Sequence, residues 1–200
     1  MATKVRIQYF FVFLFTVMLA GCSPPAPFDF SINNVPVSVV KFPYRLNSVT
    51  VNVDTNENEN VSAYGTRPVG LEKFVQPLKN SIQDAVNKSA IFDYNSHRFC
   101  TIDVKILGIN YSLVGINFPT KLYARYSIIN LQTGKPIFNK IIEGYGSTPM
   151  GYSLLGSVRD RNSIILSGQS NVRTFIDEFE AFTQKNYSKN PELNNDQPTN

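Results

Sequence analysis

The sequence predicts an α+β domain, in which an antiparallel sheet of about four strands carries two helices packed on one face. Three observations support this fold. Apolar and polar residues alternate in several segments, which is typical of half-buried strands. In two other segments the apolar residues recur every three or four positions, as they do on the buried side of a helix. The resulting order is strand, helix, three strands, helix, and it packs most simply in two layers.

Four segments predict the strands. Valines alternate with polar residues over residues 49–54, and an Asn-rich loop follows. Residues 99–113 alternate with a change of phase at Gly108, which predicts a β-bulge. Residues 121–131 and 136–145 alternate again across a short polar connection, so they predict an antiparallel hairpin.

The first helix is predicted over residues 71–90, where the apolar positions form one stripe. Pro77 leaves two alternatives for its start. Either the helix begins near Gln76 with the proline in its first turn, or a turn from Leu71 is kinked at the proline.

The second helix is expected to begin at Ser157 or Arg159 and to end at Gln184. Glu178 and Glu180 lie unfavourably near the negative end of its dipole, so we expect fraying there. Its predicted buried stripe consists of Ile164, Ile165, Gly168, Val172, Phe175, Ile176, Phe179 and Phe182.

The segments at the N-terminus follow one another in the order typical of a bacterial export signal. A basic tip precedes an apolar run of about 13 residues, which is short of the ~20 that a membrane-spanning helix needs. The motif Leu19-Ala20-Gly21-Cys22 follows and resembles the lipobox of bacterial lipoproteins. An ordinary secretory signal or an uncleaved membrane anchor is the alternative.

The lipobox resemblance implies cleavage between Gly21 and Cys22 and attachment of acyl chains, such as palmitate, to Cys22. Because Ser23 rather than Asp follows the cysteine, it also implies delivery to the periplasmic face of the outer membrane. The protein would then be lipid-anchored in the cell envelope.

This interpretation divides the chain into four parts. Residues 1–21 are the signal peptide, and residues 22–34 are the acylated cysteine with a Pro-rich extended tether. Residues 35–185 form a single α+β periplasmic domain, within the usual size of one domain. Residues 186–200, rich in Asn, Pro, Lys and Asp, are expected to form a disordered tail.

Composition limits the classes of function. With 42% hydrophobic and 17% charged residues, the chain has the composition of a folded protein. The net charge of +4 becomes +2 in the mature chain, because two of the 19 basic residues leave with the signal and all 15 acidic ones remain. No basic stretch is interleaved with aromatic residues, so we expect no nucleic-acid partner.

Few residues offer chemistry, and we expect no enzyme, no metal and no cofactor. His97 is the only histidine and is expected in a surface loop, while Cys100 is expected in the core. The loop after Asp54 begins like a calcium site but lacks the Gly and Glu that an EF-hand requires at its later positions. The carboxylates Asp93, Asp103 and Glu143 lie on different segments, so sequence alone gives no catalytic pair.

The segment 146–156 is rich in both glycine and apolar residues, and we expect flexible turns at its glycines and at Gly144. Its apolar members are Met150, Tyr152, Leu154 and Leu155. They either close the core or form an exposed patch that contacts an envelope protein or acyl chains.

The element order after a lipobox resembles the small periplasmic lipoproteins of the YajG type. More loosely, it is similar to the auxiliary lipoproteins of ABC-type lipid transporters and to the lipopolysaccharide-assembly lipoprotein. This resemblance implies a non-catalytic accessory role in an envelope transport or assembly system. The alternatives are a lipid-binding module with an apolar cavity, and an enzyme of cell-wall or lipid metabolism with a cleft around Asp103, Glu143 or His97.

Overall fold

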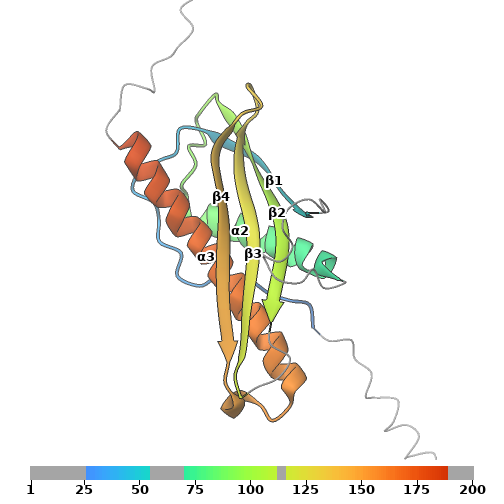
Figure 1. The fold of residues 1–200 in the computed structure, drawn as a ribbon. Coiled ribbons are helices and arrows are strands. Elements are labelled where there is room, and N and C mark those ends of the chain that lie inside the picture. The colour runs from blue at the N-terminus through green and yellow to red at the C-terminus, as the bar shows by residue number, and fades with distance from the viewer. Residues whose placement is uncertain (1–25, 55–69, 112–115, 189–200) are drawn as a thin grey trace, which may run out of the picture.

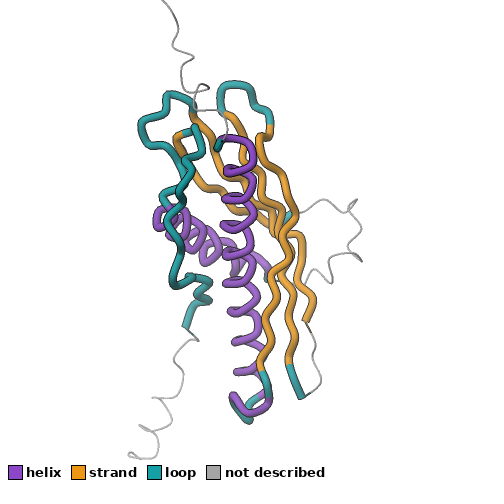
Figure 2. The backbone as a smooth tube through the Cα atoms, turned by 90° about the vertical axis from the view of Figure 1, so that its left-hand side faces the viewer, coloured by secondary structure: helices purple, strands orange, loops and turns teal. Residues whose placement is uncertain are grey.

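A computed structural model describes residues 26–54, 70–111 and 116–188. Two helices lie against one four-stranded sheet, and Figures 1 and 2 show them on the same side of it. The strands are β1 (Arg45–Val53), β2 (Phe99–Tyr111), β3 (Phe118–Asn130) and β4 (Pro136–Thr148), and the helices are α2 (Val75–Ser89) and α3 (Gly156–Tyr187). The short 3₁₀ turns η2 (Leu71–Phe74) and η3 (Met150–Tyr152) precede the two helices. The predicted α+β fold is confirmed.

The sheet differs from the prediction at one edge. Its order is β1-β2-β3-β4, and the pairs β2–β3 and β3–β4 are antiparallel as expected. The pair β1–β2 is parallel instead. The chain returns across the face of the sheet through α2 before it enters β2, and a helical crossover of this kind is how parallel neighbours are joined.

The bulge predicted in β2 is confirmed, because its register with β3 shifts between Ile106 and Gly108. Before the bulge, alternate β2 residues such as Ile102 and Val104 are fully buried on the helix side. The residues between them, such as Thr101 and Asp103, are partly exposed, and no described helix covers the other side of the sheet (Figure 2). The sheet therefore has one core face and one solvent face.

The first alternative for α2 is correct. The helix begins at Val75 with Pro77 in its first turn, where a missing backbone donor costs nothing. It ends at Ser89, and Ala90 takes a left-handed conformation (φ 47°) that caps it.

Helix α3 corrects the prediction at its far end. It continues to Tyr187, and the expected fraying at Glu178 and Glu180 is wrong. Phe179 and Thr183 are buried there, and Glu178 pairs with Lys140 of β4, so packing outweighs the dipole. Most of the predicted stripe is buried, while Ile165 and Phe182 are only partly buried.

Two glycines let α3 approach β4 closely. The expected turns at Gly144 and Gly146 are wrong, because both residues lie within β4. A Cβ atom at Gly144 would stand 2.1 Å from the carbonyl oxygen of Ser167, and one at Gly146 would stand 2.3 Å from that of Ser163. Small residues on both elements thus bring the two backbones together.

The domain also begins earlier than predicted. Phe30 is fully buried and Ile32 is 4% exposed, so the expected tether over residues 22–34 is wrong for this part. The Phe30 ring lies directly on Gly168 of α3, where a Cβ atom would come within 2.2 Å of it. The segment before β1 is therefore part of the core rather than a spacer.

Candidate functional site

One end of the molecule carries a group of exposed apolar side chains, which we call the apolar tip. It lies where β3 begins, β4 ends and α3 starts, at the lower end in Figure 1. Its members, with their exposed fractions, are Ile116 (73%), Met150 (52%), Tyr152 (58%), Leu154 (89%), Leu155 (64%) and Val158 (40%). The predicted contact residues of segment 146–156 are thus exposed together, and they do not close the core.

Two members of the tip were not predicted from the sequence. Ile116 stands in the turn before β3, and Val158 lies in the first turns of α3, outside the predicted apolar stripe. Each breaks its local pattern, since turns and the outer positions of a helix are usually polar. An apolar residue at a normally polar position was therefore the sequence feature that could have identified Ile116 and Val158.

Arg159 holds the tip together. Its guanidinium Nη1 donates a 2.9 Å hydrogen bond to the carbonyl oxygen of Ile116. The guanidinium also lies over the Phe118 ring, 4.5 Å from its centre. Arg159 is only 8% exposed, so this arginine is a structural link between α3 and the start of β3.

The backbone of η3 and of the α3 N-terminus gives the tip its shape. The Tyr152 amide donates to the carbonyl of Pro149 at 3.1 Å, and the Leu155 amide donates to the Ser153 hydroxyl at 3.1 Å. The carbonyl of Leu155 then accepts the first helical hydrogen bonds. The apolar side chains consequently project from an ordered backbone, although they face outward.

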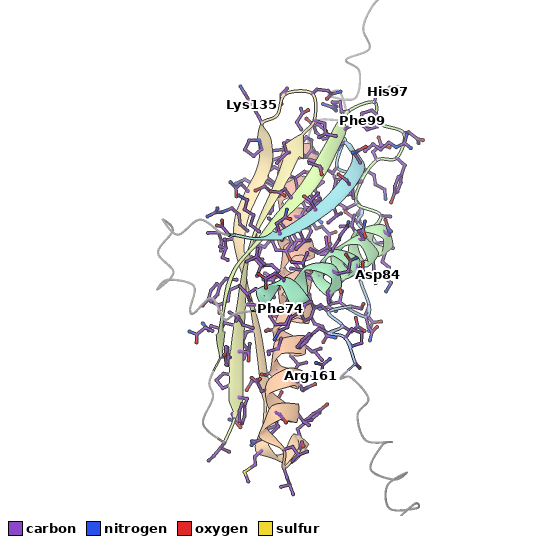
Figure 3. The ribbon with its side chains drawn as sticks, turned by 90° about the vertical axis from the view of Figure 1, so that its right-hand side faces the viewer. Phe74, Asp84, His97, Phe99, Lys135 and Arg161 are labelled. Atoms are coloured by element: carbon purple, nitrogen blue, oxygen red, sulfur yellow. The ribbon has the colours of Figure 1, made fainter. Side chains whose placement is uncertain are left out.

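The first described residues are bound to α3 close to the apolar tip. Arg161 donates a hydrogen bond to the carbonyl oxygen of Ala26, and its guanidinium lies 4.2 Å from the centre of the Phe28 ring. Figure 3 shows Arg161 near the lower end of α3, far from His97 and Lys135 at the opposite end. Phe28 in turn packs edge-on against Phe74, with ring centres 4.9 Å apart.

The candidate titratable residues are not brought together. His97 is exposed in the loop before β2. Glu143 is in register with Tyr123 and through it with Gly108, so it lies five β2 positions from Asp103, about 17 Å along the strand. Asp103 accepts a 2.7 Å hydrogen bond from the Thr50 hydroxyl.

Two other predicted residues have structural roles. The Asp93 carboxylate accepts a 2.9 Å hydrogen bond from the Asn95 amide, which shapes the loop before β2. Cys100 is fully buried as predicted, and burial raises the pKa of its thiol to about 12. A thiol in this environment is a poor nucleophile.

Lys121 and Glu143 form the clearest ion pair on the open face of the sheet, with 2.8 Å between Nζ and Oε1. The hydrogen bond from Lys121 lowers the pKa of the Glu143 carboxyl, and the same bond raises the pKa of Lys121. Both side chains are more than two-fifths exposed, so the pair belongs to the solvent-facing surface.

Two surface depressions have polar linings. One, of about 440 Å³, lies between the segment before β1 and α3 and is bordered by Ser31, Asn33, Gln169 and Arg173. The other, of about 330 Å³, is bordered by Asn110, Tyr111, Pro119 and Lys121. Both are wide open to solvent, and neither is an apolar cavity between the sheet and the helices.

Several predictions fall outside the described residues. These are the cleavage site and acylation at Gly21 and Cys22, the calcium-like loop after Asp54, and the tail beyond residue 188. Within the described ranges, no three His, Cys, Asp or Glu side chains are grouped so that they could hold a metal ion. No helix in those ranges has both the length and the apolar character needed to cross a membrane.

Comparison with known proteins gives a likeness of fold. No protein-family model matches the sequence, and no curated protein matches it. A crystal structure of a Xanthomonas campestris protein of the DUF330 family has a TM-score of 0.51 and 10% identity, over 78% of this chain and 96% of that one. The two chains therefore share a fold.

Two further solved structures are less similar. A minor lipoprotein from Acinetobacter baumannii has a TM-score of 0.43 and 10% identity, over 73% of this chain and 94% of that one. A Helicobacter pylori homologue of a neuraminyllactose-binding hemagglutinin has a TM-score of 0.48 and 8% identity, over 82% of this chain and 97% of that one.

Proposed function

We propose that this protein is a bacterial lipoprotein of the YajG type, attached by acyl chains on Cys22 to the periplasmic face of the outer membrane. Its domain acts without catalysis, as an accessory or binding subunit of an envelope transport or assembly system. The apolar tip is its contact surface for an envelope component. The observation that carries the proposal is the lipobox Leu19-Ala20-Gly21-Cys22. Its cysteine precedes Ala26 by four positions, and the carbonyl of Ala26 is already hydrogen-bonded to Arg161 of the domain.

The filled interior supports a binding or scaffold role over a lipid-carrying one. A lipid-binding module would need an apolar cavity between the sheet and the helices. Instead, Tyr126 of β3 and Phe175 of α3 stack with ring centres 4.2 Å apart, and Phe138 packs edge-on against Phe179 at 5.6 Å. At Gly144 and Gly146 the backbone of β4 lies in direct contact with α3.

The arrangement of titratable groups supports a non-catalytic role. Glycoside hydrolysis in cell-wall enzymes normally needs two carboxyl groups that flank the scissile bond, about 5–10 Å apart. His97, Asp103 and Glu143 lie at separate places, and Glu143 is engaged by Lys121. An enzyme of cell-wall or lipid metabolism would have to use other groups.

Membrane fractionation tests the anchor. The full chain is expressed in a Gram-negative host, and the mature N-terminal peptide is examined by mass spectrometry. We expect loss of residues 1–21 and an acylated Cys22, and we expect Cys22→Ala to leave the outer-membrane fraction. Cys100→Ala is the matched control, because it removes the other cysteine and leaves the lipobox intact. A Cys22→Ala chain that still sediments with the outer membrane would contradict the proposal.

The outer-membrane destination is tested separately. Density-gradient separation of the two membranes should place the wild type in the outer membrane and Ser23→Asp in the inner membrane. Ser23→Ala serves as the control, because it changes the same position without adding an acidic residue. Equal distributions of all three chains would contradict the sorting step and leave the anchor itself in place.

The accessory role is tested with the acylated protein purified from membranes. Cross-linking should join it to a component of an envelope transport or assembly system, and the purified pair should rebind in detergent. Release of peptidoglycan fragments or lipid hydrolysis products by the purified protein alone would contradict the non-catalytic role.

A further inference from the structure

The apolar tip and the start of the described chain lie at the same end of the molecule. Ala26 is held by Arg161, which stands six residues after Leu155 in the sequence. At the rise of an α-helix, six residues correspond to about 9 Å along the axis of α3. The chain thus leaves the domain close to the level of the tip.

The length of chain before Ala26 limits how far the domain can stand from its anchor. Three residues lie between Cys22 and Ala26, and a fully extended chain spans at most about 14 Å over the four steps from one Cα to the other. An acylated Cys22 is held at the bilayer surface by its acyl chains. The side of the domain that carries Ala26, and the tip with it, is therefore kept near the headgroups.

We infer that the apolar tip inserts into the surface of the same bilayer that holds the acylated Cys22, so that the protein is attached to the membrane at two points. The inference rests on the acylation proposed above. It names the lipid bilayer, rather than a protein, as the component that the tip contacts.

The chemistry of the tip suits a bilayer interface. Leu154 is 89% exposed and Ile116 is 73% exposed, which leaves large aliphatic side chains in water unless something covers them. Tyr152 adds an aromatic ring with a polar end, the type of side chain enriched where hydrocarbon meets headgroups.

Two basic side chains lie where the described chain enters the domain, Arg161 near the lower end of α3 and Lys73 of η2 closer to the middle of the molecule. Arg161 lies over the Phe28 ring, and Lys73 lies over the rings of Phe28 and Phe74 at 5.6 Å and 5.1 Å. Asp160 contributes a carboxylate among them and is electrostatically coupled to Lys73. Cations on the side of the domain that faces the bilayer are attracted by anionic headgroups.

Tryptophan fluorescence tests the inference directly, because the sequence contains no Trp. The acylated full-length protein with Leu154→Trp is incorporated into vesicles of phosphatidylethanolamine and phosphatidylglycerol, with and without bromine on the acyl chains. Leu131→Trp is the matched control: Leu131 is also an exposed leucine (47%), and its amide is hydrogen-bonded to Phe99 at the opposite end of the molecule.

We expect the Leu154→Trp emission to shift to shorter wavelength on vesicles, and brominated lipid to quench it several-fold more strongly than the Leu131→Trp emission. Because Leu154 is 89% exposed, the substitution leaves the fold unchanged, and far-ultraviolet circular dichroism verifies this. Mass spectrometry of the same samples reports whether Cys22 is acylated.

The outcomes separate the inference from the proposed function. An acylated, vesicle-bound protein whose two tryptophans are quenched equally overturns the inference and leaves the anchor in place. A shifted Leu154→Trp emission that brominated lipid does not quench also overturns it, because the tip is then covered by protein. An unmodified Cys22 overturns the inference and the proposed function together.

Discussion

Tyr126 of β3 donates a 2.6 Å hydrogen bond from its hydroxyl to the side-chain oxygen of Asn171 in α3, and both residues are fully buried. The Asn171 amide nitrogen also donates to the carbonyl oxygens of Leu122 in β3, at 3.2 Å, and of Ile142 in β4, at 2.8 Å. One side chain of the helix is thus bonded to two strands. A buried polar side chain whose hydrogen bonds are all made, such as Asn171, fixes the position of the helix relative to the strands.

Asn171→Ala should lower the free energy of unfolding by about 3 kcal/mol, because it leaves the buried Tyr126 hydroxyl without its acceptor. Urea unfolding followed by circular dichroism measures the change. Asn186→Ala is the control: this residue is exposed near the end of the same helix, and its loss should cost less than about 0.5 kcal/mol. Equal effects of the two substitutions would show that the buried contact contributes nothing.

Gly146→Ala should destabilise the domain by about 3 kcal/mol, because the new methyl group would stand 2.3 Å from the Ser163 carbonyl oxygen and α3 would have to move away from β4. Thermal and urea unfolding provide the measurement. Gly151→Ala is the matched control, since no atom lies within 4 Å of a Cβ built there. If both variants were as stable as the wild type, the close approach of helix and strand would be disproved.

Phe30→Ala should cost about 4 kcal/mol, as expected for the loss of a fully buried phenylalanine. Val39→Ala, in the same segment before β1 but 88% exposed, should be close to neutral. Limited proteolysis provides a second readout, because loss of Phe30 should expose the segment before residue 35 to cleavage. A neutral Phe30→Ala would restore the interpretation of this segment as a tether.

Glu143→Gln should lower stability at neutral pH, and the difference from the wild type should disappear in acid. The pKa of Glu143 is lowered in the folded protein, so its contribution is fully present above the usual carboxyl pKa of 4.5 and is lost as the pH falls through the lowered pKa of the folded state. Unfolding measured between pH 7 and pH 3 tests this, with Lys121→Met and the double variant completing a thermodynamic cycle. A difference that did not decrease between pH 7 and pH 3 would rule out the ion pair as its source.

The apolar tip was only partly predictable. Its central residues are visible in the sequence as apolar positions among glycines, but their exposure is not, because burial depends on what packs above them. The proximity of Ala26 to Arg161 joins residues 135 positions apart, and no local pattern reports a contact of that kind. Whether the tip closes the core or faces outward was therefore decided by tertiary packing alone.

The sequence by itself determined the order of the strands and helices, the bulge beside Gly108 and the buried position of Cys100. These follow from side-chain periodicity and backbone chemistry, which act over a few residues. Tertiary structure alone decided the parallel pairing of β1 with β2, the burial of Phe30 and the contact of Gly144 with α3. Each of these three features depends on which surfaces pack together. Segments distant in the sequence determine that packing, so local propensity does not predict it.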